Sequence, residues 1–247
     1  MTQGAGLGVS LSTMLKVALN GARQVGSHPA LPITADELAD AAAACIVAGA
    51  TAVHLHPRDD SGRESLEPDV IARTVARIAT TVGNVPIGVS TGAWIEPDTV
   101  RRVAAVGRWE GPHMASVNLS EEGAEQVMRA LLGQGIGVEA GIWSVEDVYR
   151  LARTGLQDRV VRVLVEIVYP VEDPQGEARA IDEALDRIGV TTPRLHHGED
   201  DSTWPVLRQA KLLGHDIRIG LEDTLTLPDG SSVPSNEALV KVALTID

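Results

Sequence analysis

TAVHLHPRD, residues 51–59, is the segment from which the fold and the chemistry of this chain can be worked out. Successive side chains of a strand point to opposite faces, so Val53 and Leu55 share one face and His54 and His56 the other. Two imidazoles roughly 7 Å apart along a strand can converge on one metal ion. They can equally be hydrogen-bonded histidines in a polar pocket. The charged loop that follows at once favours the metal interpretation.

The loop after the two histidines carries a possible partner for them. Asp59 could orient an imidazole from behind, or it could simply pair with Arg58. The sequence leaves both interpretations open.

Short β-branched runs alternate with longer stretches of helical periodicity along the whole chain. No linker, low-complexity tract or block of like charges divides it. Eight strand–helix units in about 230 residues predict a single α/β domain over residues 1–247, a (β/α)₈ TIM barrel with right-handed crossovers. Residues 1–12 are expected to be a flexible lead-in. The strands are expected at residues 14–20, 51–56, 86–90, 114–118, 136–140, 160–167, 193–197 and 216–222.

Helix starts are marked by capping residues. Thr34 and Glu37 have the spacing of a capping box, and Pro68 stands where a first helical residue is expected. Ser120 and Ser144 are expected to be N-caps of two later helices.

The expected strands also predict where a site lies. In most of them one parity is apolar, which suits the side that faces the helices, and the other becomes polar toward the C-terminal end. Polar groups that point at the barrel axis are costly unless they meet a ligand, a metal or each other. Because barrel active sites are built at the C-terminal ends of the strands, the parity predicts a site there.

Composition narrows the class of protein. The chain has 21 Lys plus Arg against 34 Asp plus Glu, and a net charge of −13 disfavours nucleic acid and anionic membranes as partners. No run approaches the roughly 20 apolar residues of a bilayer span, and the N-terminus lacks a secretory pattern. The single cysteine, Cys45, fits a cytoplasmic location and is expected to be a buried, inert thiol. No phosphate-binding glycine motif implies ATP or NAD.

A second constellation lies near the C-terminus, in RIGLED, residues 218–223. Glu222 shares the inward parity of Arg218 and would complete a set of two histidines and one carboxylate with an open position. Zinc held in this way acts as a Lewis acid on a carbonyl oxygen, although the same ligands suit other divalent ions. Asp223 could act as a general base. The alternative is a salt-bridged strand end without a catalytic role.

Other polar residues at strand ends are candidates for substrate contacts. Ser90, in STGA, is a hydrogen-bond donor to a substrate or a base. Ser116, Asn118 and Glu139 are substrate-contact candidates, with capping or core roles as the alternative. Only one residue of the pair His196 and His197 can face inward, whereas the histidines without an evident partner are expected at the surface or satisfied in the core: His28, His113 and His215.

With these residues in view, the chain resembles the β-keto acid cleavage enzymes, a family of zinc (β/α)₈ barrels. The combination of LPIT, HLHxRD and GLED is specific to this family, and the resemblance covers nearly the whole chain. It implies condensation of a β-keto acid with acetyl-CoA, which releases acetoacetate and the acyl-CoA of the remainder. The resemblance runs through residues 20–22, 29–42, 48–66, 89–93, 116–118, 220–225 and 235–240.

The resemblance also implies roles for individual residues. It makes His54, His56 and Glu222 the zinc ligands. It makes Asp223 the base that starts the reaction. The resemblance further implies a homo-oligomer, because most members of the family are tetramers. Arg218 and Ser90 would support the base, and Ser116 stands where the family has a small hydroxyl residue near the substrate.

Two departures from the family pattern bear on the substrate. The branch that cleaves an amino-substituted keto acid has acids where this chain has Arg23 and Gly141. Losing a carboxylate and gaining a cation disfavours a cationic substrate, so we predict a neutral or anionic β-keto acid, with Arg23 pairing to a distal carboxylate. Two alternatives remain: a metal-dependent barrel hydrolase or aldolase that needs no acetyl-CoA, and a non-catalytic metal- or ligand-binding barrel.

Overall fold

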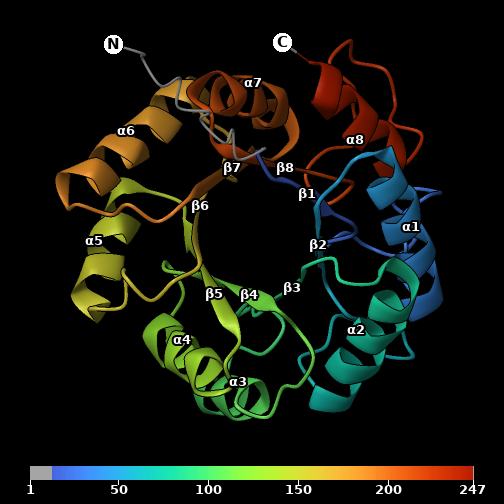
Figure 1. Ribbon diagram of the computed structural model, residues 1–247, viewed down its shortest axis with the longest axis horizontal. Coiled ribbons are helices and arrows are strands. Elements are labelled where there is room, and N and C mark those ends of the chain that lie inside the picture. The colour runs from blue at the N-terminus through green and yellow to red at the C-terminus, as the bar shows by residue number, and fades with distance from the viewer. Residues whose placement is uncertain (1–12, 247) are drawn as a thin grey trace, which may run out of the picture.

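The strands close into a barrel in which every neighbouring pair is parallel and the strands follow chain order. Helices surround it as an outer ring (Figure 1), which confirms the predicted (β/α)₈ barrel. The computed structural model describes residues 13–246, so the expected lead-in over residues 1–12 lies outside the described residues. The elements are β1 (Leu15–Ala18), α1 (Ala35–Ala48), β2 (Ala52–Leu55), α2 (Pro68–Val82), β3 (Ile87–Ser90), α3 (Thr99–Val106), β4 (Met114–Asn118), α4 (Ala124–Gly133), β5 (Gly137–Ile142), α5 (Val145–Thr154), β6 (Arg162–Ile167), α6 (Pro174–Arg187), β7 (Arg194–Gly198), the 3₁₀ turn η1 (Asp200–Ser202), α7 (Thr203–Leu213), β8 (Asp216–Ile219) and α8 (Asn236–Thr245).

The strands bury side chains on both of their faces, as barrel strands do. Val53 and Leu55 of β2 belong to the apolar core between barrel and helices, and His54 between them points the other way. Polar residues also fill the barrel near the N-terminal ends of the strands, which the sequence did not predict. There Lys16 forms a buried ion pair with Glu139. Burial lowers the pKa of Lys16, although Glu139 opposes that shift.

Three of the four predicted helix starts are confirmed. Thr34 and Glu37 form the complete capping box of α1, Pro68 opens α2, and the Ser144 side chain caps α5. The prediction for Ser120 is wrong, because residues 119–122 form a turn and α4 starts only after Gly123, which adopts a left-handed conformation. Within residues 13–246 no helix is long and apolar enough to cross a membrane.

The last strand is shorter than predicted. β8 ends at Ile219 rather than at residue 222, and the chain turns over residues 220–223, where the Asp223 amide donates to the Gly220 carbonyl. A Cβ on Gly220 would lie only 1.7 Å from the Ala18 carbonyl oxygen, so the turn requires glycine at this close approach to β1. Glu222 therefore reaches the site from a turn and not by strand parity.

Cys45 provides a test of core packing. Its side chain on α1 is fully buried, and burial raises the pKa of the thiol to about 12, with a further contribution from nearby Glu237. We expect a disulfide reagent at pH 8 to label the native protein at most slowly, since only the exposed thiolate reacts, and to label one thiol per chain in guanidinium. Because Cys45 is the only cysteine, absorbance of the released thiolate measures this directly. Rapid labelling of the native protein would contradict the packing.

Candidate functional site

A cavity of about 410 Å³ opens among the C-terminal ends of the strands. This is where the parity of the sequence placed a site, and where barrel enzymes bind their substrates. It brings together residues from loops and strands that are up to 200 positions apart in the chain, such as Ala22 and Glu222. The predicted site residues that line it are Arg23, His54, His56, Ser90, Ser116, Asn118, Arg218 and Glu222.

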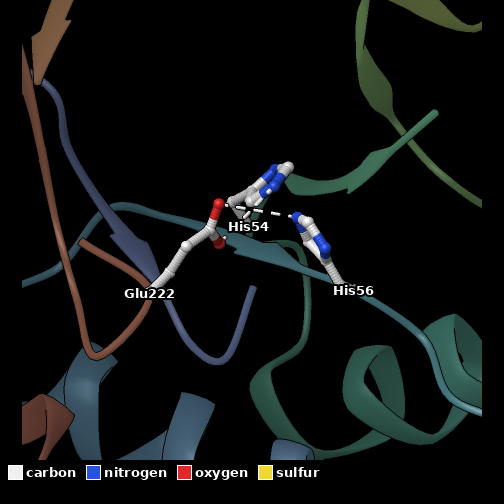
Figure 2. Close-up of side chains that lie close together, drawn as sticks. All are labelled: His54, His56 and Glu222. Carbon is white, nitrogen blue, oxygen red and sulfur yellow. Dashed lines mark ion pairs between the residues drawn. The ribbon is translucent and has the colours of Figure 1, made fainter. Parts of the chain in front are cut away.

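Three of these residues form a compact cluster of possible metal ligands (Figure 2). His56 Nε2 lies 3.5 Å from one carboxylate oxygen of Glu222, and His54 Nε2 lies 3.8 Å from the other. The backbone of Gly21, with φ of +58°, passes beside Glu222, and a Cβ there would lie 2.3 Å from the Glu222 Cγ. Glycine at position 21 thus makes room for the carboxylate to reach the two histidines.

The cluster suits a divalent metal, because its own members do not satisfy each other's hydrogen-bonding capacity. One donor atom from each of the three residues lies within 4.8 Å of the others. Glu222 Oε2 is buried and has no hydrogen-bond partner among the described residues. A buried carboxylate oxygen without a partner is costly, and a cation would remove that cost. Two imidazoles and a carboxylate are a donor set that zinc accepts.

The imidazole of His56 is oriented from behind by Glu64, whose carboxylate lies 2.5 Å from Nδ1. This contact directs Nε2 toward Glu222, as carboxylates behind metal-bound histidines do. Asp59 has neither of the roles considered for it: it binds Ser61 and Arg63 in its own loop.

Neighbouring charges set the protonation of the cluster. Burial alone would lower the pKa of His56, but Glu222 and Glu64 outweigh it and raise the pKa to about 9. For His54, burial dominates and holds the pKa well below its usual value. Burial would raise the pKa of Glu222, but Arg218 and the two histidines hold it well below the usual range. Glu222 is therefore the anionic member of the cluster, and the two imidazoles beside it differ in pKa.

Asp223 lies beneath the cavity and does not line it. Its side chain is fully buried, and Arg218 Nη2 donates to it at 2.7 Å while the same atom donates to Glu222 at 2.5 Å. His197 Nδ1 lies 3.5 Å from Asp223 Oδ1 on another side. Arg218 and His197 thus stand between this carboxylate and the cavity, which the sequence did not anticipate.

A second carboxylate, Glu166 of β6, does line the cavity. It accepts a hydrogen bond from Trp143 Nε1 at 2.8 Å and lies 3.6 Å from His197 Nε2. Burial and Arg218 would lower the pKa of His197, but contacts with Asp223 and Glu166 raise it to about 9. Sequence reasoning missed Glu166, although its place at the end of the run VVRVLVEI was a usable signal.

The remaining predicted contacts divide into two groups. Ser116 and Asn118 line the cavity, and Asn118 donates to Glu121 at 2.8 Å. The substrate-contact prediction for Glu139 is not supported, because this carboxylate lies in the barrel interior with Lys16 and Arg162 instead of lining the cavity. His197 faces inward and His196 outward, as the strand alternation requires.

Trp94 covers the metal-ligand cluster from the loop after β3. Its ring stacks on the imidazole of His56 at a centroid distance of 6.1 Å, and its Nε1 donates to Glu64 at 3.2 Å. The Trp94 side chain is half exposed. It thereby shields the contact between Glu64 and His56 from water, and sequence reasoning gave no signal for this placement.

We expect Glu64→Gln to weaken metal binding about 10- to 100-fold, the usual cost of losing a carboxylate behind a ligand histidine. The amide cannot draw the Nδ1 proton of His56 as a carboxylate does. A competition titration with a coloured chelator measures the change. Glu67→Gln, at an exposed acid three residues away, is the control and should bind metal normally. Equal affinities for the two variants would contradict the orienting role of Glu64.

Comparisons with known proteins match this chain to one family. The model of a family described as beta-keto acid cleavage enzyme matches residues 12–246. A curated relative from Cupriavidus necator, 3-oxoadipate:acetyl-CoA acetyltransferase, is 39% identical over 80 residues. That match spans 32% of this chain and only 28% of the relative.

Solved structures match in fold. The apo structure of ObcA superposes with a TM-score of 0.70 at 17% identity, over 87% of this chain and 61% of ObcA. The 3-dehydroquinate dehydratase of Enterococcus faecalis superposes with a TM-score of 0.60 at 10% identity, over 95% of each chain. At such identities the likeness concerns the barrel alone.

Proposed function

The chain belongs to the beta-keto acid cleavage enzyme family, and on that premise we propose that it condenses a β-keto acid with acetyl-CoA, releasing acetoacetate and the acyl-CoA of the remainder. The observation that carries the proposal is the cluster of His54, His56 and Glu222 in the wall of a cavity at the strand ends. The curated relative, whose name pairs a keto acid with acetyl-CoA, supports the choice of co-substrate.

The proposed cofactor is a divalent metal, zinc by its donor set, held by these three residues. When bound, zinc would supply Lewis acidity toward the keto and carboxylate oxygens of the substrate. The protein's own contribution is to fix the ligands: Glu64 orients His56, and Arg218 holds the carboxylate of Glu222 through a hydrogen bond of 2.5 Å.

The proposed base is Asp223, positioned by Arg218 and supported by Ser90. Arg218 bonds both Glu222 and Asp223, so it ties the base to the ligand cluster. The buried position of Asp223 means that substrate binding has to shift Arg218 before a proton can reach the carboxylate. Catalytic hydrogen bonds often tighten only in the complex with substrate, so this arrangement is compatible with a base.

The proposed substrate is a neutral or anionic keto acid. Arg23 lines the cavity, where its Nη2 lies 3.1 Å from Asp200 Oδ1. Gly141 cannot be replaced by an acid without movement, because a Cβ there would lie 2.6 Å from Asn118 Oδ1 and 3.1 Å from Glu166 Oε1. Glu166 therefore places a carboxylate near position 141. The charge of this carboxylate faces His197. Arg23 remains available to a distal carboxylate if Asp200, which is exposed, releases it.

The experiment incubates the zinc-loaded protein with a panel of β-keto acids, with and without acetyl-CoA, and follows acetoacetate. The panel includes 3-oxoadipate, a neutral homologue and an amino-substituted keto acid. We expect acetoacetate only with acetyl-CoA, and the highest rates with uncharged or anionic acids. Keto acid consumption without acetyl-CoA would favour a hydrolase or aldolase. Zinc binding without any turnover would favour a non-catalytic barrel. A preference for the amino-substituted keto acid would refute the prediction of a neutral or anionic substrate.

A further inference from the structure

A second cluster of side chains that could ligate a metal lies outside the barrel, away from the cavity at the strand C-terminal ends. It joins Asp182 of α6, His196 of β7 and His215, which stands between α7 and β8. His197 points into the cavity, so its neighbour His196 points outward toward the helix layer. Figure 1 shows β7 and β8 on the inner side of α7, with α6 next to α7 in the outer ring. His215 immediately precedes β8, at the end of that strand opposite the cavity.

The two imidazoles of this cluster face one carboxylate. His196 Nε2 lies 3.4 Å from Asp182 Oδ1, and His215 Nε2 lies 3.7 Å from Asp182 Oδ2. The rings stack at a centroid distance of 4.5 Å and an angle of 12°. Near-parallel rings that meet the same carboxylate present their Nε2 atoms side by side.

His196 is the member of this cluster whose ring nitrogens have no hydrogen-bond partner among the described residues. Its side chain is fully buried, and neither ring nitrogen forms a hydrogen bond with any described residue. The 3.4 Å approach to Asp182 is close but does not have hydrogen-bond geometry. Buried polar atoms without partners are uncommon and costly, and a cation bound at Nε2, the nitrogen that faces Asp182, would remove that cost for one of the two.

The other neighbours of Asp182 do not remove that cost. Arg194 donates to Asp182 Oδ1 at 2.9 Å and also pairs with Asp186. This guanidinium offsets the negative charge of Asp182, but it forms no hydrogen bond with His196, whose two ring nitrogens have no partner among the described residues. Asp182 Oδ2 faces His215 and remains open to a cation.

We propose that Asp182, His196 and His215 form a second divalent-metal site, of the donor set that zinc takes, which ties α6, β7 and the segment between α7 and β8 together. Tetrahedral zinc with ligands at about 2.0–2.1 Å separates them by roughly 3.4 Å, and His196 Nε2 and Asp182 Oδ1 already lie 3.4 Å apart. The three donor atoms lie within 4.8 Å of one another, so a small movement of His215, the half-buried member, completes the set.

The site is accessible to an ion and separate from catalysis. A surface groove lined by Asp182, His215 and Gln209 leads to it from solvent. It lies between the barrel and the helix layer, away from the C-terminal ends of the strands. Residues away from those ends typically stabilise a barrel and do not take part in its reaction. Metal bound there would stabilise the folded chain, because the three ligands come together only on folding.

The experiment separates the two sites. A His54→Ala/His56→Ala double variant removes the ligands of the cavity, and zinc chloride alone is titrated into it by calorimetry. We expect one zinc per chain and a rise in the thermal midpoint with zinc. Both should be lost when His215→Asn is added and retained when His113→Asn, an exposed histidine elsewhere, is added instead. Circular dichroism checks the fold of each variant.

A second comparison needs no change in the cavity. Metal analysis of the otherwise unaltered protein should give two zinc ions per chain, and one in His215→Asn, with acetoacetate formation unchanged if the proposed activity holds. A double variant that binds no zinc, or an equal loss in His113→Asn, would overturn the site. Failure of the activity assay would leave this stoichiometry, and hence this inference, untouched.

Discussion

Replacing His54 with alanine is expected to remove one equivalent of bound zinc and to lower acetoacetate formation roughly a thousand-fold or more. A Lewis acid contributes several kcal/mol to the stabilisation of a charged transition state, and about 1.4 kcal/mol corresponds to a factor of ten in rate. His54 contributes one of three protein ligands, and its ring is 2% exposed, so no outside side chain can replace it. Metal analysis after dialysis and initial rates with saturating acetyl-CoA measure both effects.

The matched control is His113→Ala, which removes an exposed imidazole that lines neither metal-ligand cluster. It should keep both its zinc and its activity. Since the second cluster of Asp182, His196 and His215 is untouched, the His54→Ala protein should still hold the other zinc equivalent. Full activity in a protein that has lost this metal would show that the cluster is not part of the reaction. Full metal content would show that the ligand set is wrong.

The fold could be predicted from sequence because a parallel barrel has a strong local signature. Each of the eight expected strands overlaps an observed one, and the strand ends differ by a few residues. The largest error, at β8, arose because apolar and polar residues continue to alternate through residues 220–222 although the backbone turns at Gly220. Periodicity reports side-chain type, whereas the turn is imposed by contact with β1.

The site could be predicted only in part. Residues within a strand or directly after it, such as His54 and His56, have their position fixed by local alternation. Glu64 is brought to His56 by a loop that folds back, in which Arg58 pairs with Glu64 across an isolated bridge. No pattern in the sequence encodes such a return. The same holds for Asp182 and His215, which meet only because helices α6 and α7 pack on neighbouring strands.

A polar side chain that points into the barrel can either line the cavity or form an ion pair inside the barrel, and the sequence could not separate these two cases. Ser116 and Glu139 both have polar side chains on adjacent strands and are register partners. Ser116 lines the cavity, whereas Glu139 is neutralised by Lys16 inside the barrel. Which of them meets substrate depends on their height along the barrel axis and on whether a cation from another strand is near. Neither is a property of one segment.

Asp223→Asn is expected to keep the zinc and lose most of the turnover, by about 10²- to 10⁴-fold, the usual contribution of a positioned proton-transfer group. The amide is nearly the same size as the carboxylate and can still accept a hydrogen bond from Arg218, so the ligand cluster should keep its geometry. It cannot accept a proton from the substrate. Rates at saturating substrate and zinc content, measured on the same preparation, separate loss of chemistry from loss of metal.

The strongest comparison is Glu166→Gln, the same change of carboxylate to amide at the acid that lines the cavity. If Asp223 is the base, Glu166→Gln should retain far more turnover, because it alters only a hydrogen bond from Trp143 and the contact with His197. If instead Glu166→Gln is inactive and Asp223→Asn is active, the proton goes to the carboxylate that is already open to the cavity, and Asp223 serves only to hold Arg218. The buried position of Asp223 makes this a real choice, since a base behind a guanidinium works only if substrate binding moves Arg218 aside.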